Sequence, residues 1–85
     1  MDFIIRNVYK KQDISSTIKV IGTCNGRQVV IRYCHLVDPR MYDVPTSSSS
    51  CLFGNLIYEK NGIEYEKAVF VIRKGNNMYR IISRY

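Results

Sequence analysis

Three short Gly/Asn segments punctuate the sequence, and each is flanked on both sides by β-branched and aromatic residues. They are Asn25-Gly26, Asn61-Gly62 and Gly75-Asn76-Asn77. A two-residue turn that matches the twist of a β-hairpin needs positive φ angles, which Gly and Asn adopt at the lowest cost. The three segments therefore predict three β-hairpins, which would make up most of a chain of 85 residues.

The runs of β-forming residues around these turns predict six strands. A chain of this length forms a single domain (1–85), and closing its sheet removes the unpaired edges that so small a domain cannot cover otherwise. We therefore expect a mostly β, hairpin-built barrel or curled sheet, SH3-like or OB-like, with little helix. The expected strands are Phe3–Tyr9, Ser16–Thr23, Arg27–Leu36, Leu52–Tyr58, Ile63–Arg73 and Met78–Arg84.

The longest irregular stretch is predicted at residues 37–50. It contains Pro39, Pro45 and the run Ser47-Ser48-Ser49-Ser50. Proline removes a donor from a β-ladder, and a serine run has no apolar side chain to bury. We expect an irregular, mobile loop, with one helical turn possible where Asp38 precedes Pro39 as a cap.

Register and core follow from the turns. A two-residue turn at Asn25-Gly26 places Val20 opposite Ile31 and Lys19 opposite Arg32. A turn at Gly75-Asn76 places Phe70 opposite Ile81. Strand alternation then gives the predicted core, which is Ile18, Val20, Val29, Ile31, Phe70, Ile72 and Ile81, and it also buries Tyr33 and Tyr79.

Like charges directly opposed across a ladder cost up to about 1 kcal/mol. This cost would apply to Glu59 and Glu64 in a two-residue turn at Asn61-Gly62, so a longer loop over residues 59–62 is expected. It would also apply to Lys19 and Arg32, unless a carboxylate or a bound anion lies beside them.

The formal net charge of +6 is unevenly distributed along the chain. Residues 1–34 and 68–85 each carry a net charge of +4, whereas residues 35–67 carry −2. On the register above, Arg73, Arg80 and Arg84 share the non-core face of the last hairpin. The terminal strands of a closed barrel are often neighbours, so we expect the two basic ends to merge into one stripe.

The cysteines and the single histidine give no sign of catalysis or metal binding. Cys24, Cys34 and Cys51 are odd in number and lack C-x-x-C spacing, and His35 follows Cys34 directly, so the two side chains diverge on a strand. We expect no enzyme, no metal and no cofactor. Free thiols fit a reducing compartment, and charge appears too early for a signal peptide, so a cytoplasmic protein that does not bind membranes is expected.

The charge pattern instead predicts a binding module. Basic residues interleaved with exposed apolar ones on a sheet face are typical of a surface that binds nucleic acid or a protein partner. The seven tyrosines are a second indication, since tyrosine can stack on a base, and DNA and RNA are equally compatible. The alternative is a protein-interaction or inhibitor module that binds an acidic protein surface, such as an accessory protein of a virus or mobile element. The residues predicted to contact nucleic acid are Lys19, Arg32, Arg73, Arg80 and Arg84.

Overall fold

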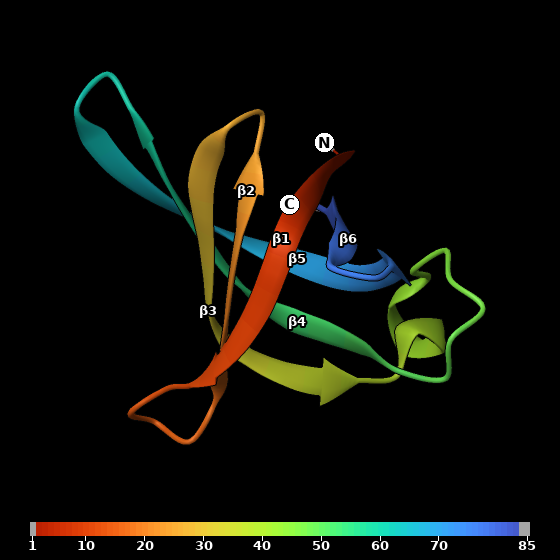
Figure 1. The fold of residues 1–85 in the computed structure, drawn as a ribbon. Helices are drawn as coiled ribbons and strands as arrows, with labels where there is room; N and C mark the ends of the chain where they lie inside the picture. The colour runs from red at the N-terminus through yellow and green to blue at the C-terminus, as the bar shows by residue number, and fades with distance from the viewer. Residues whose placement is uncertain (1, 84–85) are drawn as a thin grey trace.

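The computed structural model describes residues 2–83, which form a closed six-stranded antiparallel barrel (Figure 1). Each strand pairs with its neighbours in the chain, and β1 closes the barrel against β6. The predicted mostly β barrel is therefore confirmed. The strands are β1 Asp2–Gln12, β2 Ile18–Cys24, β3 Arg27–Val37, β4 Cys51–Lys60, β5 Ile63–Gly75 and β6 Met78–Ile82.

Two of the three predicted turns have the expected geometry. Asn25 and Gly26 have φ angles of 52° and 79°, and Asn61 and Gly62 have 54° and 80°, as a type I′ turn requires. The second turn does place Glu59 opposite Glu64, so the expectation of a longer loop there is wrong. The tight turn prevails because both carboxylates are exposed and their mutual repulsion is small.

The last hairpin turns one residue later than predicted. Its turn is Asn76-Asn77, with Gly75 opposite Met78 and an extra residue in β5 at Lys74. Phe70 therefore faces Ile82, and the predicted pairing of Phe70 with Ile81 is wrong by one position.

Two strands contain a bulge that faces a glycine on the next strand. In β1 the pairing shifts around Asn7, opposite Gly22, and in β3 it shifts around Tyr33, opposite Gly54. Asn7 and Tyr33 adopt positive φ angles of 54° and 60°. A Cβ on Gly54 would lie 2.9 Å from the Arg32 carbonyl oxygen, so the glycine permits the close approach. Bulges of this kind sharpen the bend that closes a small barrel.

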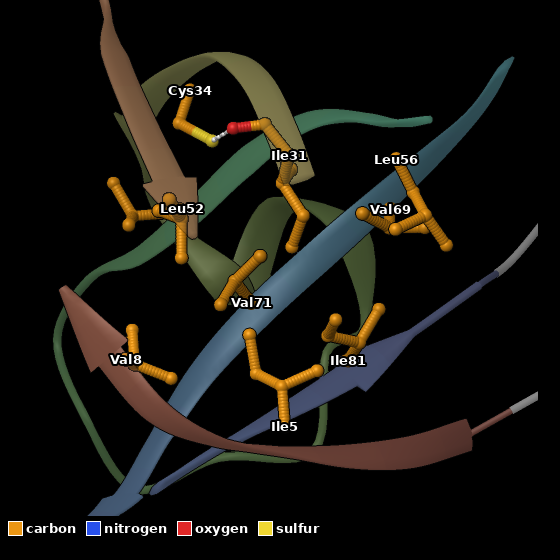
Figure 2. Close-up of a cluster of buried hydrophobic side chains, with 10 residues drawn as sticks. Ile5, Val8, Ile31, Cys34, Leu52, Leu56, Val69, Val71 and Ile81 are labelled. Carbon is orange, nitrogen blue, oxygen red and sulfur yellow. Dashed lines mark hydrogen bonds between the residues drawn. The ribbon is translucent and has the colours of Figure 1, made fainter. Parts of the chain in front are cut away.

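The barrel interior holds the main core. Figure 2 shows side chains from β1, β3, β4, β5 and β6 pointing toward one another inside the barrel. The buried members of this cluster are Ile5, Val8, Val20, Ile31, Cys34, Leu52, Leu56, Val69, Val71 and Ile81. Of the predicted core, Val20, Ile31 and Ile81 lie in this cluster, and Ile18 and Val29 pack against it half-buried.

A second buried cluster lies on the outer side of the barrel wall. Phe70 and Ile72 belong to it, and so does Val44, from the connection between β3 and β4. The ring of Tyr42, in the same connection, lies 5.4 Å from that of Phe70. Phe70 and Ile72 are thus core residues, as predicted, whereas Val69 and Val71 are buried on the opposite side of β5.

The connection between β3 and β4 contains a short 3-10 helix, η1, at Pro39–Tyr42. Asp38 caps it, since its Oδ1 accepts a hydrogen bond from the backbone N–H of Arg40 at 3.0 Å. Pro39 and Val44 are buried, whereas the serine run is exposed and lies outside any strand. The mobility of this segment stays a prediction. Within residues 2–83, no helix is long and apolar enough to cross a membrane.

Candidate nucleic-acid interface

The predicted basic residues occupy more than one face. Lys19 and Arg32 lie on the outer side of β2 and β3. Arg73 pairs with Tyr79, on the side of the hairpin that lines the barrel, whereas Arg80 pairs with Ile72 on the outer side. The prediction that Arg73 and Arg80 share a face is therefore wrong, because the extra residue at Lys74 places Arg73 opposite Tyr79. Arg84 lies outside the described residues.

Lys19 is opposed to a like charge, but the partner differs from the predicted one. The bulge at Tyr33 takes Arg32 out of register with β2, and Lys19 instead lies directly opposite Lys11 of β1. Among the described residues, neither ammonium group lies within 4 Å of a carboxylate. The Lys11–Lys19 pair is thus an uncompensated concentration of positive charge on the outer face of the β1–β2 ladder.

Arg32 is held beside this pair by two contacts. Its Nε lies 3.6 Å from Oδ2 of Asp13, a carboxylate that is only 8% exposed. Its guanidinium carbon lies 5.1 Å from the centroid of the Tyr33 ring. Tyr33 was expected in the core, but the bulge turns it outward and leaves it 41% exposed. Arg32 and Tyr33 therefore present a cation and an aromatic ring side by side.

A shallow cleft of about 520 Å³ lies between β1 and the end of the β5–β6 hairpin. Tyr9, Lys10 and Arg73 line it together with Tyr79, and Asn76 and Asn77 close one side. Lys10 Nζ lies 5.5 Å from the centroid of the Tyr79 ring. Two cations, two aromatic rings and two amide side chains therefore share one depression.

These groups lie on two sides of β1. Lys10 pairs with the buried Val20 and lies with Arg73 on the side that lines the barrel, whereas Lys11 and Lys19 lie on the outer side. The cleft contains Lys10, Lys11 follows it on β1, Lys19 lies opposite Lys11, and Arg32 lies on the adjacent strand. We call this set the basic stripe and define it as Lys10, Lys11, Lys19, Arg32 and Arg73.

Negative charge is concentrated at the other end of the barrel. Glu59, Glu64 and Glu66 lie on the outer side of the β4–β5 hairpin, which extends far beyond the barrel at the upper left of Figure 1. The β1–β2 and β5–β6 connections, which flank the basic stripe, lie at the opposite end. The outer side of the β4–β5 hairpin is therefore acidic.

Sequence reasoning missed Tyr9, Lys10 and Lys11 as site residues. It ended the first strand at Tyr9 and placed the lysines in a polar connection, whereas β1 continues to Gln12. The extension is recognised only in the structure, where residues 9–12 pair one to one with residues 18–21 of β2.

The cysteines and the histidine are arranged for packing. Burial raises the pKa of the Cys34 thiol to about 11, and its Sγ donates a weak hydrogen bond to the Ile31 carbonyl oxygen at 3.5 Å (Figure 2). His35 is exposed on the opposite side of β3, with its ring edge against Phe53. Within residues 2–83, no three His, Cys, Asp or Glu side chains are grouped closely enough to hold a metal ion.

Fold and site together define a small closed β-barrel with a basic, tyrosine-containing face. Comparison of the chain with protein-family models, with curated proteins and with solved structures finds no match in any of the three. The role of the basic stripe is therefore inferred from its own chemistry.

Proposed function

We propose that the protein binds single-stranded nucleic acid along the basic stripe, without chemical catalysis. The observation that carries the proposal is the uncompensated Lys11–Lys19 pair on the outer side of β1, next in sequence to Lys10, which lines the cleft together with Arg73. A nucleic-acid backbone supplies negative charges at regular spacing, and each phosphate that meets a Lys or Arg releases counterions. The lysines and arginines of the basic stripe would supply the complementary positive charges.

The Lys11–Lys19 pair also gives binding an energetic rationale. Directly opposed like charges destabilise a ladder by up to about 1 kcal/mol, and the folded protein carries this cost while no anion is bound. A phosphate between the two ammonium groups would relieve the repulsion, so part of the binding free energy comes from strain already present in the barrel.

The tyrosines favour single strands over duplexes. Tyr9 is 57% exposed, and Tyr33 lies beside Arg32 at the other end of the stripe. Bases stack on aromatic rings only when they are unpaired, and such stacking tolerates any sequence. Asn76 and Asn77 in the cleft add amide groups that hydrogen-bond to base edges. Stacking and phosphate contacts are common to RNA and DNA, so the proposal covers both.

A salt titration tests the proposal. The Kd of the protein for fluorescently labelled single-stranded RNA, single-stranded DNA and duplex DNA is measured by anisotropy at increasing salt. Five phosphate contacts predict a slope of about 3.5 in log Kd against log salt concentration for single strands. Absence of salt-sensitive binding to any nucleic acid at low ionic strength, or tighter binding to the duplex, would contradict the proposal.

The second candidate function is the binding of an acidic protein surface. It is supported by a cross-strand row of partly exposed apolar side chains beside the stripe, in which Ile21 pairs with Val30 and Val30 pairs with Ile57. An interface with an apolar centre loses less affinity with added salt than a phosphate backbone does. A protein that fails the nucleic-acid titration would be assigned to this class.

A further inference from the structure

The inner side of the projecting β4–β5 hairpin differs in chemistry from its outer side. Strand alternation places all three glutamates of the hairpin outward, whereas Tyr58, Lys60, Tyr65 and Lys67 lie on the side that lines the barrel. The rings of Tyr58 and Tyr65 stack with centroids 5.5 Å apart and an interplanar angle of 19°. The hairpin therefore presents an aromatic and cationic surface at the barrel end opposite the basic stripe.

This surface forms one wall of an apolar cleft of about 360 Å³ at the barrel end. Leu56, a buried core residue, lies in the cleft, and Phe3 and Val29 line it as half-buried side chains that pack against the core. The volume lies at the lower end of the range for small-molecule sites, which are mostly apolar with a few polar groups. The cleft thus has the size and lining of a site for a small apolar molecule.

The two lysines specify the charge of the occupant. Lys67 lies directly opposite Leu56 and is half-buried, and Lys60 lies at the rim of the same cleft. Among residues 2–83, neither ammonium forms an ion pair, because the neighbouring glutamates lie on the other side of the hairpin. A cation removed from water is stabilised by an anionic partner, which an occupant of the cleft would supply.

From this arrangement we propose a second ligand site, in which the cleft binds a medium-chain carboxylate. The alkyl chain lies against Leu56, Phe3 and Val29, and the carboxylate accepts hydrogen bonds from Lys60 and Lys67. The proposal is independent of nucleic-acid binding, since it uses none of the residues of the basic stripe.

The test measures the Kd of the purified protein for hexanoate, octanoate, decanoate and decanol by NMR titration, below the concentrations at which they form micelles. Each added methylene of the acids should tighten binding about fourfold. Decanol should bind more weakly than decanoate, and the shifted signals should include Phe3, Val29 and Leu56. Equal affinity for decanol and decanoate, no dependence on chain length, or shifts confined to the basic stripe would overturn the proposal.

Charge-matched variants isolate the role of the lysines. Lys60→Gln/Lys67→Gln replaces each ammonium group by a neutral polar amide. It should weaken decanoate binding about tenfold or more, while the affinity for decanol stays unchanged. Lys11→Gln/Lys19→Gln removes the same charge at the other end of the barrel and should leave decanoate binding intact. Equal losses in both variants would indicate general attraction between charges and overturn the proposed site.

An anionic membrane lipid also combines acyl chains with a negative charge, and vesicle sedimentation separates this source from the free acid. In salt that screens the attraction between the net charge of +6 and the anionic headgroups, the protein should bind the free acid and stay in the supernatant with phosphatidylglycerol vesicles. Sedimentation with vesicles in the absence of decanoate binding would overturn the proposal.

Discussion

At the scale of single residues, Asp13 connects the short β1–β2 loop to the barrel wall. Its backbone N–H donates to the Thr17 carbonyl oxygen at 2.7 Å, and its Oδ1 accepts from the Ile14 N–H at 2.8 Å. Its Oδ2 faces Arg32 Nε at 3.6 Å, and neither of these two buried atoms has a hydrogen-bond partner among the described residues. Asp13 therefore holds Arg32 mainly through charge.

Replacing Asp13 by Asn tests this role. The amide keeps the size of the side chain and the acceptor for Ile14, but it removes the charge that faces Arg32. We expect the free energy of unfolding to fall by about 1–3 kcal/mol, because a partly buried guanidinium loses its counter-charge. Urea denaturation measures the change, and the exposed Glu66→Gln variant controls for the added net charge. Equal stability of the two variants would show that the Asp13–Arg32 pair contributes nothing.

The three thiols should differ in reactivity. The thiolate is the reactive form, and burial raises the pKa of Cys34 to about 11 and also raises that of Cys51. Near pH 8 both buried thiols stay protonated and shielded, whereas Cys24 is partly exposed. We expect iodoacetamide to modify Cys24 alone in the native protein and all three thiols in denaturant, as read by peptide mass spectrometry. Native modification of Cys34 at the rate of Cys24 would contradict the packing of β3.

At the scale of elements, the bulge of β3 and Gly54 of β4 form one unit. A Cβ on Gly54 would lie 2.6 Å from Cys34 Sγ as well as 2.9 Å from a backbone oxygen that cannot move alone. Gly54→Ala should therefore lower the free energy of unfolding by about 1–3 kcal/mol through overpacking. Gly75→Ala is the control, since its Cβ would meet only Met78 Cε at 3.7 Å. Similar melting temperatures for the two variants would contradict this role of the bulge.

The buried cluster on the outer side of the barrel wall, which contains Phe70, should contribute as much to stability as the barrel interior. Phe70 is 1% exposed and packs against Phe53 and Tyr42. Phe70→Ala should cost roughly 3–5 kcal/mol, comparable with the whole stability of a small domain. Leu36→Ala, at a side chain that is 68% exposed, should change stability little. A Phe70→Ala protein that melts within a few degrees of the parent would refute the burial of this face.

The hairpins were predictable from sequence because Asn-Gly pairs specify both the turn and its register. The segment Gly75-Asn76-Asn77 contains two candidate turns, and the turn used, together with the extra residue at Lys74, leaves the pairing one position from the predicted one. The bulges had no sequence signal, since Asn7 and Tyr33 lie within otherwise regular β-forming runs. At residues 69–72 alternation was uninformative, because both sides of β5 are buried.

The same causes limited the prediction of the candidate site. Lys19, Arg32 and Arg73 were proposed from sequence, and their contact with nucleic acid stays a prediction. The structure places Lys19 and Arg32 on the outer side of β2 and β3 and Arg73 on the side that lines the barrel. Arg80 was misplaced with the register of the last hairpin. Lys10 and Lys11 were missed because a polar run beyond an apolar strand resembles a loop, and only the pairing with β2 shows it to be strand.

At the scale of the whole molecule, the longest dimension is 37 Å, and lysines lie at both ends of the barrel. The basic stripe lies toward the end with the β1–β2 and β5–β6 connections, and the glutamates lie on the β4–β5 hairpin at the other end. The outward glutamates repel a polyanion, but Lys60 and Lys67 lie on the inner side of the same hairpin, so the position of the binding surface has to be tested at both ends. The central claim is that nucleic acid binds at the stripe and not wherever lysines occur.

The most direct test compares the salt dependence of single-stranded nucleic-acid binding for two variants of equal charge. Lys11→Gln/Lys19→Gln should reduce the slope of log Kd against log salt concentration by about 1.4, because two phosphate contacts are lost. Lys60→Gln/Lys67→Gln, at the opposite end of the barrel, should leave the slope of the parent unchanged. Equal reductions in both variants, or an unchanged slope in the first, would contradict binding at the basic stripe.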